Sequence, residues 1–183
     1  MNIITTPIEG LFILEPRVFN DDRGYFYESY NKNTFKADTG LDINFVQDNQ
    51  ARSTKNVLRG LHYQNHPSAQ SKLIRAIEGK IWDVVVDIRK NSKTYGQWFG
   101  LELSLENKRQ FYIPKGFAHG YSVLSETAEV FYKCDEFYNK ASEGGLNYAD
   151  PNINIDWKID IADAIVSEKD LVQPYLEVLV STF

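Results

Sequence analysis

Histidine is scarce in this sequence, and its three copies, His62, His66 and His119, are the first residues that could do chemistry. Imidazole titrates near neutral pH, so it can act as a general base or bind a metal, but it also serves as an ordinary hydrogen-bonded side chain. His62 ends the run Leu58-Arg59-Gly60-Leu61-His62. A glycine inside a strand often marks the close approach of a ligand or of another backbone. Both roles are therefore open for His62.

His119 ends the segment Pro114–His119, whose Pro-x-Gly-x-x-His spacing is typical of cupins. In metal-binding cupins this histidine is one ligand, and an earlier strand supplies a His-x-His pair with a later Glu. Here the earlier strand reads His62-Tyr63-Gln64, so the second histidine is missing, and His66 beside Pro67 is expected in a loop. The pattern predicts a cupin shape without the facial metal site.

A lysine and a tyrosine are the next candidates for chemistry. Lys72 shares a predicted strand face with Ile74 and Ala76. It either extends past them to solvent or presents its cation to a developing oxyanion. Tyr132 shares its face with Val130, so it is expected to point inward. An inward tyrosine is usually a packing residue with a hydrogen-bonded hydroxyl, and less often a proton donor.

A further group combines arginines with amide, carboxylate and aromatic side chains. Arginine suits a diphosphate, because its planar guanidinium donates hydrogen bonds in pairs. Taken singly, each of these residues is more often a surface group than a ligand. The group consists of Phe19, Arg23, Glu28, Gln47, Asn49 and Arg59.

Short strands must position these side chains. Alternating apolar and polar residues, or short apolar runs, mark them. The strands are expected over residues 57–63, 72–77, 82–89, 101–105 and 128–135. Turn signals recur between them at short intervals, which is typical of a β-sandwich or barrel. Short helices are expected only at 31–36 and at 167–170, where Ser167 can cap the first turn. No linker or repeat is visible, so we predict one all-β domain over residues 1–183.

Strict alternation leaves one conflict, because it puts Arg59 and His62 on opposite faces of the same strand. Either Gly60 marks a β-bulge that rotates the face, or Arg59 reaches a ligand by another route. The strand pattern is compatible with both.

Composition excludes several classes of protein. The 183 residues carry 20 Lys and Arg against 25 Asp and Glu, a formal charge of −5, so no general basic face for nucleic acid is expected. A local cationic pocket remains compatible with this balance. The single cysteine, Cys134, excludes an internal disulfide and a zinc site of several thiolates. We expect no membrane span and no signal peptide, and hence a cytoplasmic location.

Eleven segments carry a family resemblance. They are Phe19–Glu28, Val46–Gln50, Val57–Gln64, Gln70–Arg75, Asp83–Arg89, Pro114–Gly120, Tyr132–Cys134, Phe137-Tyr138, Glu143–Gly145, Asp150-Pro151 and Ser167–Asp170. Together they resemble the dTDP-4-dehydrorhamnose 3,5-epimerase family from about residue 4 to 176. The family often has Phe at the position of Tyr121 and Tyr-Tyr at Phe137-Tyr138, and both departures could alter the pocket wall.

The resemblance implies a cupin jelly roll with short peripheral helices, free of metal and of cofactor, and assembled as a homodimer. The implied reaction is epimerisation of dTDP-4-dehydro-6-deoxy-D-glucose at C3 and C5 to dTDP-4-dehydro-L-rhamnose. This step belongs to dTDP-L-rhamnose and cell-surface polysaccharide synthesis, including that of lipopolysaccharide. No cofactor is expected, because the C4 ketone of the substrate is itself the electron sink.

The resemblance also assigns roles to residues. His62 would be the base with Asp170 as its partner, Lys72 would stabilise the enolate, and Tyr132 would return a proton from the opposite face. General-base help contributes about 10²–10⁴-fold to a rate, and an oxyanion-stabilising donor about 3–4 kcal/mol. Arg59 and His119 would line the sugar–diphosphate pocket. The nucleotide would be held by Phe19, Arg23, Glu28, Gln47, Asn49, Tyr138, Glu143 and Lys169.

Other functions remain open at this point. An epimerase acting only at C3 would share His62, Asp170 and Lys72, and the presence of Tyr132 favours the double epimerase. A ketoisomerase of the same cupin class is a weaker alternative. A metal-dependent cupin oxygenase is disfavoured by the missing histidine. A non-catalytic nucleotide-sugar-binding cupin would leave these residues as packing groups.

Overall fold

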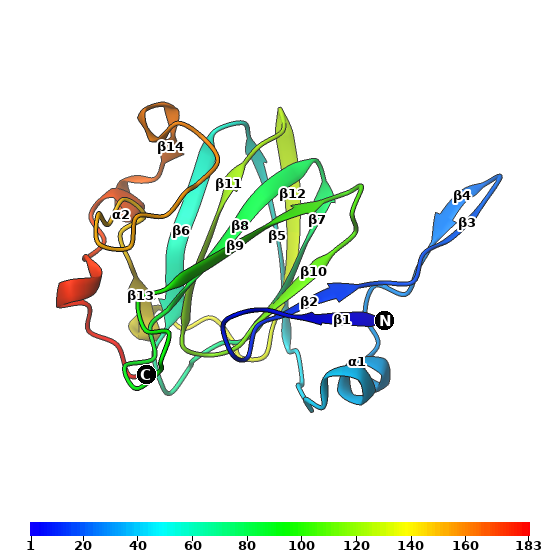
Figure 1. Cartoon of the computed structure of the whole chain (residues 1–183), viewed down its shortest axis with the longest axis horizontal. Helices are drawn as coiled ribbons and strands as arrows, with labels where there is room; N and C mark the ends of the chain where they lie inside the picture. The colour runs from blue at the N-terminus through cyan, green and yellow to red at the C-terminus, as the bar shows by residue number, and fades with distance from the viewer.

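Two antiparallel β-sheets face each other in the computed structural model, which describes residues 1–183 (Figure 1). The first sheet has the strand order β1-β2-β10-β7-β12-β5, and the second has the order β13-β6-β11-β8-β9 with β14 parallel to β6. The first sheet contains β1 Asn2–Thr5, β2 Phe12–Glu15, β5 Gln47–Thr54, β7 Lys72–Glu78, β10 Gln110–Ile113 and β12 Thr127–Cys134. The second contains β6 Val57–Gln64, β8 Lys80–Asp87, β9 Trp98–Ser104, β11 Phe117–Val123, β13 Glu143–Gly145 and β14 Ile165–Val166.

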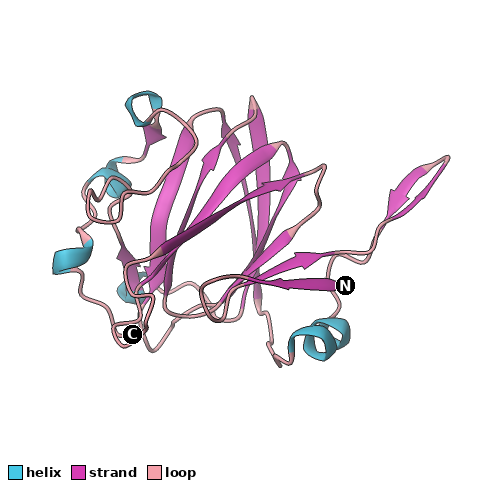
Figure 2. Ribbon diagram, in the orientation of Figure 1, coloured by secondary structure: helices cyan, strands magenta, loops and turns pink.

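Helices are few and short, and they lie around the sheets (Figure 2). They are the α-helices α1 Lys32–Thr39 and α2 Glu168–Leu171 and the 3₁₀ helices η1 Lys140–Ser142, η2 Ile161–Asp163 and η3 Leu176–Val178. Both predicted helices are confirmed. Asn31 caps α1 by accepting from the backbone N–H of Asn33 and Thr34, and Ser167 caps α2. None of these helices has the length and apolar character that crossing a bilayer requires.

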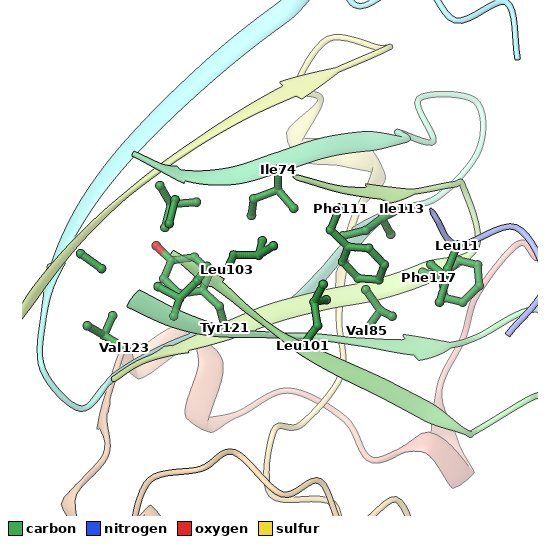
Figure 3. Packing of buried hydrophobic residues seen from close by; sticks show 14 of the residues in the cluster. Leu11, Ile74, Val85, Leu101, Leu103, Phe111, Ile113, Phe117, Tyr121 and Val123 are labelled. Carbon is green, nitrogen blue, oxygen red and sulfur yellow. The ribbon is translucent and has the colours of Figure 1, made fainter. Parts of the chain in front are cut away.

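The main core fills the space between the two sheets, and all five strands predicted from the sequence contribute to the fold. Figure 3 shows Ile74 of β7 and Phe111 of β10 packed against Val85 of β8 and Leu103 of β9. These four side chains are fully buried. Alternation along each strand directs one set of apolar side chains into this layer. The result is the two-sheet arrangement of a jelly roll.

A second core lies on the outer side of β6 and β8, where the C-terminal third of the chain covers the sheet. Trp157 and Leu179 from this segment pack with Leu58 of β6 and with Val84 and Val86 of β8. Strand β8 is therefore buried on both faces, with Val84 facing the C-terminal segment and Val85 the main core. This packing holds the C-terminal segment, including α2, beside β6 (Figure 1).

The hairpin of β3 Phe19–Asp21 and β4 Gly24–Phe26 belongs to neither of the two large sheets and forms a separate two-stranded sheet. It forms an arm that projects away from the body (Figure 1). All six of its strand residues are exposed, including Phe19 and Phe26 with 51% and 70% of their surface accessible.

Candidate active site

A cavity of about 460 Å³ opens between the two sheets. The four residues expected to be catalytic, His62, Lys72, Tyr132 and Asp170, all line it. So do Arg59, His119 and Lys169, which were expected to bind the substrate. Strands β6 and β11 of one sheet supply His62 and His119, strands β7 and β12 of the other supply Lys72 and Tyr132, and α2 supplies Asp170.

A second cavity of about 180 Å³ adjoins the first, because His62, Lys72 and Tyr132 line both. Its other walls contain four of the residues expected to hold the nucleotide. These are Gln47, Asn49, Tyr138 and Glu143. The two cavities therefore form one continuous site whose two ends are lined by different sets of residues.

Three of the expected binding residues lie elsewhere in the chain. Phe19 and Arg23 belong to the projecting arm, where the Arg23 guanidinium pairs with Asp21 of the same hairpin. Glu28 accepts a hydrogen bond from the Asn31 side chain at 3.0 Å. None of the three lines either cavity.

A β-bulge brings Arg59 and His62 to one cavity. His62 pairs with His119 and Arg59 with Tyr121, so three residue steps on β6 face two on β11. The extra residue reverses the alternation between these two positions, which puts both side chains on the same side. Gly60 lies inside the bulge with φ +110°, and a Cβ there would approach the His119 carbonyl oxygen to 2.6 Å. Of the two explanations left open by the sequence, the bulge is correct.

His62 is held by a buried carboxylate. Its Nε2 lies 2.6 Å from Oδ1 of Asp170, whose side chain is only 3% exposed. The Gly60 N–H donates to the other carboxylate oxygen at 3.2 Å, and Ser167 caps the backbone N–H of Asp170. Burial opposes ionisation of Asp170, but the hydrogen bond and charge of His62 and the Gly60 N–H outweigh it and lower the pKa of this carboxyl. Because Nε2 is engaged, Nδ1 is the imidazole nitrogen left to act on a ligand.

A second imidazole–carboxylate pair, which the sequence analysis missed, lies deeper in the same sheet. Asp83 of β8 is fully buried, and its two oxygens lie 2.9 and 3.1 Å from Nε2 of His119. Burial raises the pKa of Asp83, while the charge and hydrogen bond of His119 act in the opposite direction. A signal was present in the sequence, since an aspartate inside the apolar run of β8 needs a buried partner.

Lys72 and Tyr132 present a cation and a phenol to the cavity. Burial lowers the pKa of Lys72, and Lys72 forms no ion pair within the chain. Burial also raises the pKa of Tyr132 to about 12, with Cys134 and Tyr121 acting in the same direction. The Tyr132 hydroxyl therefore keeps its proton at neutral pH and makes no hydrogen bond to another protein group. It is free to donate to a ligand.

The mouth of the site carries a linked set of polar groups. Lys169 of α2 forms an ion pair with Glu143 of β13, and the Tyr138 hydroxyl donates to Glu143 at 3.3 Å. Arg59, by contrast, has no carboxylate partner. With Lys72, it gives an acidic protein two basic side chains without a direct carboxylate partner in one cavity, an arrangement that favours an anionic ligand.

The structure arranges no group of three or more His, Cys, Asp or Glu side chains that could hold a metal ion. The residues that do converge supply a base, an acid and a cation around one open volume. This set suits removal and return of a proton at a carbon next to a carbonyl group.

Known proteins resemble the chain over nearly its whole length. Residues 5–177 match the family model described as dTDP-4-dehydrorhamnose 3,5-epimerase. The enzyme of that name from Shigella flexneri is 52% identical over 171 residues, which cover 93% of each protein. The crystal structure of the Elizabethkingia anophelis enzyme is 55% identical, with a TM-score of 0.93 and 97% of each chain covered.

A liganded structure is similar as well. The dTDP-6-deoxy-D-glucose-3,5-epimerase of Legionella pneumophila, in complex with dTDP-4-keto-L-rhamnose, is 47% identical with a TM-score of 0.94. The alignment covers 98% of this chain and 94% of that one. These similarities confirm the jelly-roll fold expected from the sequence.

Proposed function

The chain belongs to the dTDP-4-dehydrorhamnose 3,5-epimerase family, and we propose that its residues invert C3 and C5 of dTDP-4-dehydro-6-deoxy-D-glucose by proton transfer across the main cavity. The observation that carries this proposal is the placement of two groups. His62 enters the cavity from one sheet and Tyr132 from the facing sheet. Inversion of a carbon centre needs a base on one face and an acid on the other, and this arrangement supplies both.

His62 begins the reaction as the base. Its Nδ1 takes the proton from C3 or C5, each of which is adjacent to the C4 ketone, and the C–H electron pair forms the enolate. Asp170 holds Nε2–H at 2.6 Å and stabilises the imidazolium that results. Because both carbons are activated by the same ketone, one base can serve both centres.

Lys72 and Tyr132 complete each inversion. Lys72, which forms no direct ion pair within the chain, stabilises the negative charge that develops on the C4 oxygen. Tyr132 then donates its phenolic proton to the carbon from the opposite face, and the enolate returns to the ketone. Proton exchange with solvent resets the tyrosine and the imidazolium for the next centre.

The adjoining cavity is our proposed location for the dTDP portion. Arg59 and His119 bind the sugar–diphosphate end, and Gln47, Asn49 and Tyr138 line the nucleotide end. Lys169 and Glu143 stand between the two ends at the mouth.

We further propose that a second copy of the chain completes the site. Phe19 and Arg23, which the family resemblance assigns to the nucleotide, lie on an arm that projects from the body and line neither cavity of their own chain. The arm exposes Phe19, Tyr25 and Phe26, apolar surface that a monomer would leave in water. A twofold dimer would place each arm at the partner's cavity and cover this surface.

Proton NMR in deuterium oxide with dTDP-4-dehydro-6-deoxy-D-glucose tests the chemistry. The wild-type protein should introduce deuterium at C3 and at C5 and invert both centres. His62→Ala should abolish exchange at both, whereas His66→Ala should behave as wild type, because His66 is exposed and lies outside both cavities. Exchange and inversion confined to C3 would instead identify a C3-only epimerase, and binding without exchange a nucleotide-sugar-binding protein.

Subunit complementation tests the dimer. His62→Ala and Arg23→Ala variants, each impaired alone, are co-expressed so that mixed dimers form. If Arg23 serves the partner's cavity, a mixed dimer has one intact site, and activity should recover to roughly a quarter of the wild-type value at random pairing. No recovery would place Arg23 and His62 in the same subunit's site and contradict the exchanged arm.

A further inference from the structure

Arg59 is fixed at the cavity by a hydrogen bond that joins the two sheets. Its Nε donates to Oγ of Ser53 at 3.0 Å, and its Nη2 reaches the Arg52 carbonyl oxygen at 3.4 Å. Ser53 lies on β5 of one sheet, while Arg59 lies on β6 of the other. The guanidinium is exposed and has no carboxylate partner, so these two contacts are what orient it within the chain.

Ser53 is a buried polar side chain on the inward side of β5. Its surface is only 7% accessible, on a strand whose inward positions Gln47 and Asn49 are also polar. Its oxygen accepts from Arg59, and the buried hydroxyl of Tyr121 beside it has no other hydrogen-bond partner. Burial raises the pKa of Tyr121, and hydrogen bonding to the Ser53 hydroxyl acts against this shift. Arg59, which Ser53 bonds, is the one arginine of the cavity.

We propose that Ser53 is a positioning residue, which sets the plane of the Arg59 guanidinium so that its remaining N–H groups face the diphosphate of the nucleotide sugar. This inference rests on the proposed function, because the diphosphate belongs to the substrate named there. With Nε and one N–H of Nη2 engaged, both N–H groups of Nη1 and the second of Nη2 remain available for paired contacts with phosphate oxygens. An arginine held this way loses less conformational freedom when the ligand binds.

The expected signature is a change in binding without a change in chemistry. Arg59 contacts neither the reacting carbons nor the proton-transfer groups in the proposed mechanism. Ser53→Ala should therefore raise KM about tenfold, equivalent to about 1.4 kcal/mol, and leave kcat within twofold of wild type. The Kd of dTDP, measured by calorimetry, should rise by a similar factor.

The matched control is Ser104→Ala. Ser104 is also a buried serine on a strand, and it accepts a hydrogen bond from the Asn107 backbone N–H at 3.1 Å, but it lies outside both cavities. This variant should lower the melting temperature and leave KM and the Kd of dTDP unchanged. A merely structural role for Ser53 predicts the same behaviour for Ser53→Ala.

A double-variant cycle ties the effect to Arg59. In an Arg59→Ala background, Ser53→Ala should not weaken dTDP binding further, because the group that it positions is absent. Full additivity of the two losses, or an unchanged Kd in a folded Ser53→Ala protein, would overturn the inference. Failure of the wild type to epimerise its substrate would instead refute the proposed function, because the dTDP measurement is independent of turnover.

Discussion

The carboxylate of Asp170 offers the sharpest test of the proposed proton transfer, since Asp170→Asn changes one atom in a buried group. The asparagine oxygen can still accept from the Gly60 N–H, which now bonds the carboxylate at 3.2 Å. The amide NH₂ then faces Nε2 of His62, 2.6 Å away in the wild type. Two donors cannot meet, so the imidazole proton moves to Nδ1, the nitrogen that should accept the substrate proton.

The size of the effect follows from the two interactions lost. A hydrogen bond to a charged group is worth about 1.5–3 kcal/mol, and restoring the tautomer that can act as base leaves two N–H donors facing each other, at a cost of about 1–3 kcal/mol more. At about 1.4 kcal/mol per factor of ten, kcat should fall roughly 10²- to 10⁴-fold with KM little changed. Rates of deuterium incorporation at C3 and C5, followed by NMR, measure the loss directly. A kcat within threefold of wild type would refute the orienting role of Asp170.

The same variant has a defined effect on stability. The pKa of Asp170 is lower in the folded chain than the value near 3.9 of an unfolded one. The ionised carboxylate therefore adds stability above about pH 4, and this is lost as pH falls through the folded-state pKa. Thermal melts of Asp170→Asn should show a lower melting temperature than wild type at pH 7, with the gap narrowing below pH 4. A gap that widens in acid would show that the pKa is not lowered.

Two further predictions concern other parts of the site. Tyr132→Phe should keep the melting temperature near that of wild type, because the hydroxyl makes no protein hydrogen bond. Inversion at C5 should fall far more than solvent exchange at C3. An unchanged C5 inversion rate in the NMR assay would move the acid role to another group. Gly60→Ala should destabilise the fold by at least about 2 kcal/mol in denaturant titrations, because a side chain at φ +110° is strained and would meet the His119 carbonyl oxygen. An alanine variant with wild-type stability and KM would show that the bulge tolerates a Cβ.

Local patterns in the sequence identified most of the elements that carry the site. Alternation predicted β8 and β12, and with β12 the inward direction of Tyr132. Ser167 caps a helix in both sequence and structure, and the helix expected over 31–36 forms with Asn31 as its cap. These features depend on neighbours a few residues apart, so a single chain segment contains the information needed to predict them.

Strand β5 shows where such patterns fail. Gln47–Thr54 was not predicted as a strand, because three of its four inward residues, Gln47, Asn49 and Ser53, are polar like its outward ones. These three polar side chains line the second cavity or bond Arg59, and Ala51 lines the main cavity. A binding surface replaces the hydrophobic face from which a strand is normally recognised.

The assembly of the site was decided by tertiary structure. His62 and Asp170 are 108 residues apart, and they meet because the second core holds the C-terminal segment against β6. The pairing of Asp83 with His119 and the bulge at Gly60 depend on the register between neighbouring strands. Register is set by long-range packing, which leaves no periodic trace in either strand alone. The sequence by itself thus determined which side chains and strands are present, and only the packed sheets decided which of them share a cavity.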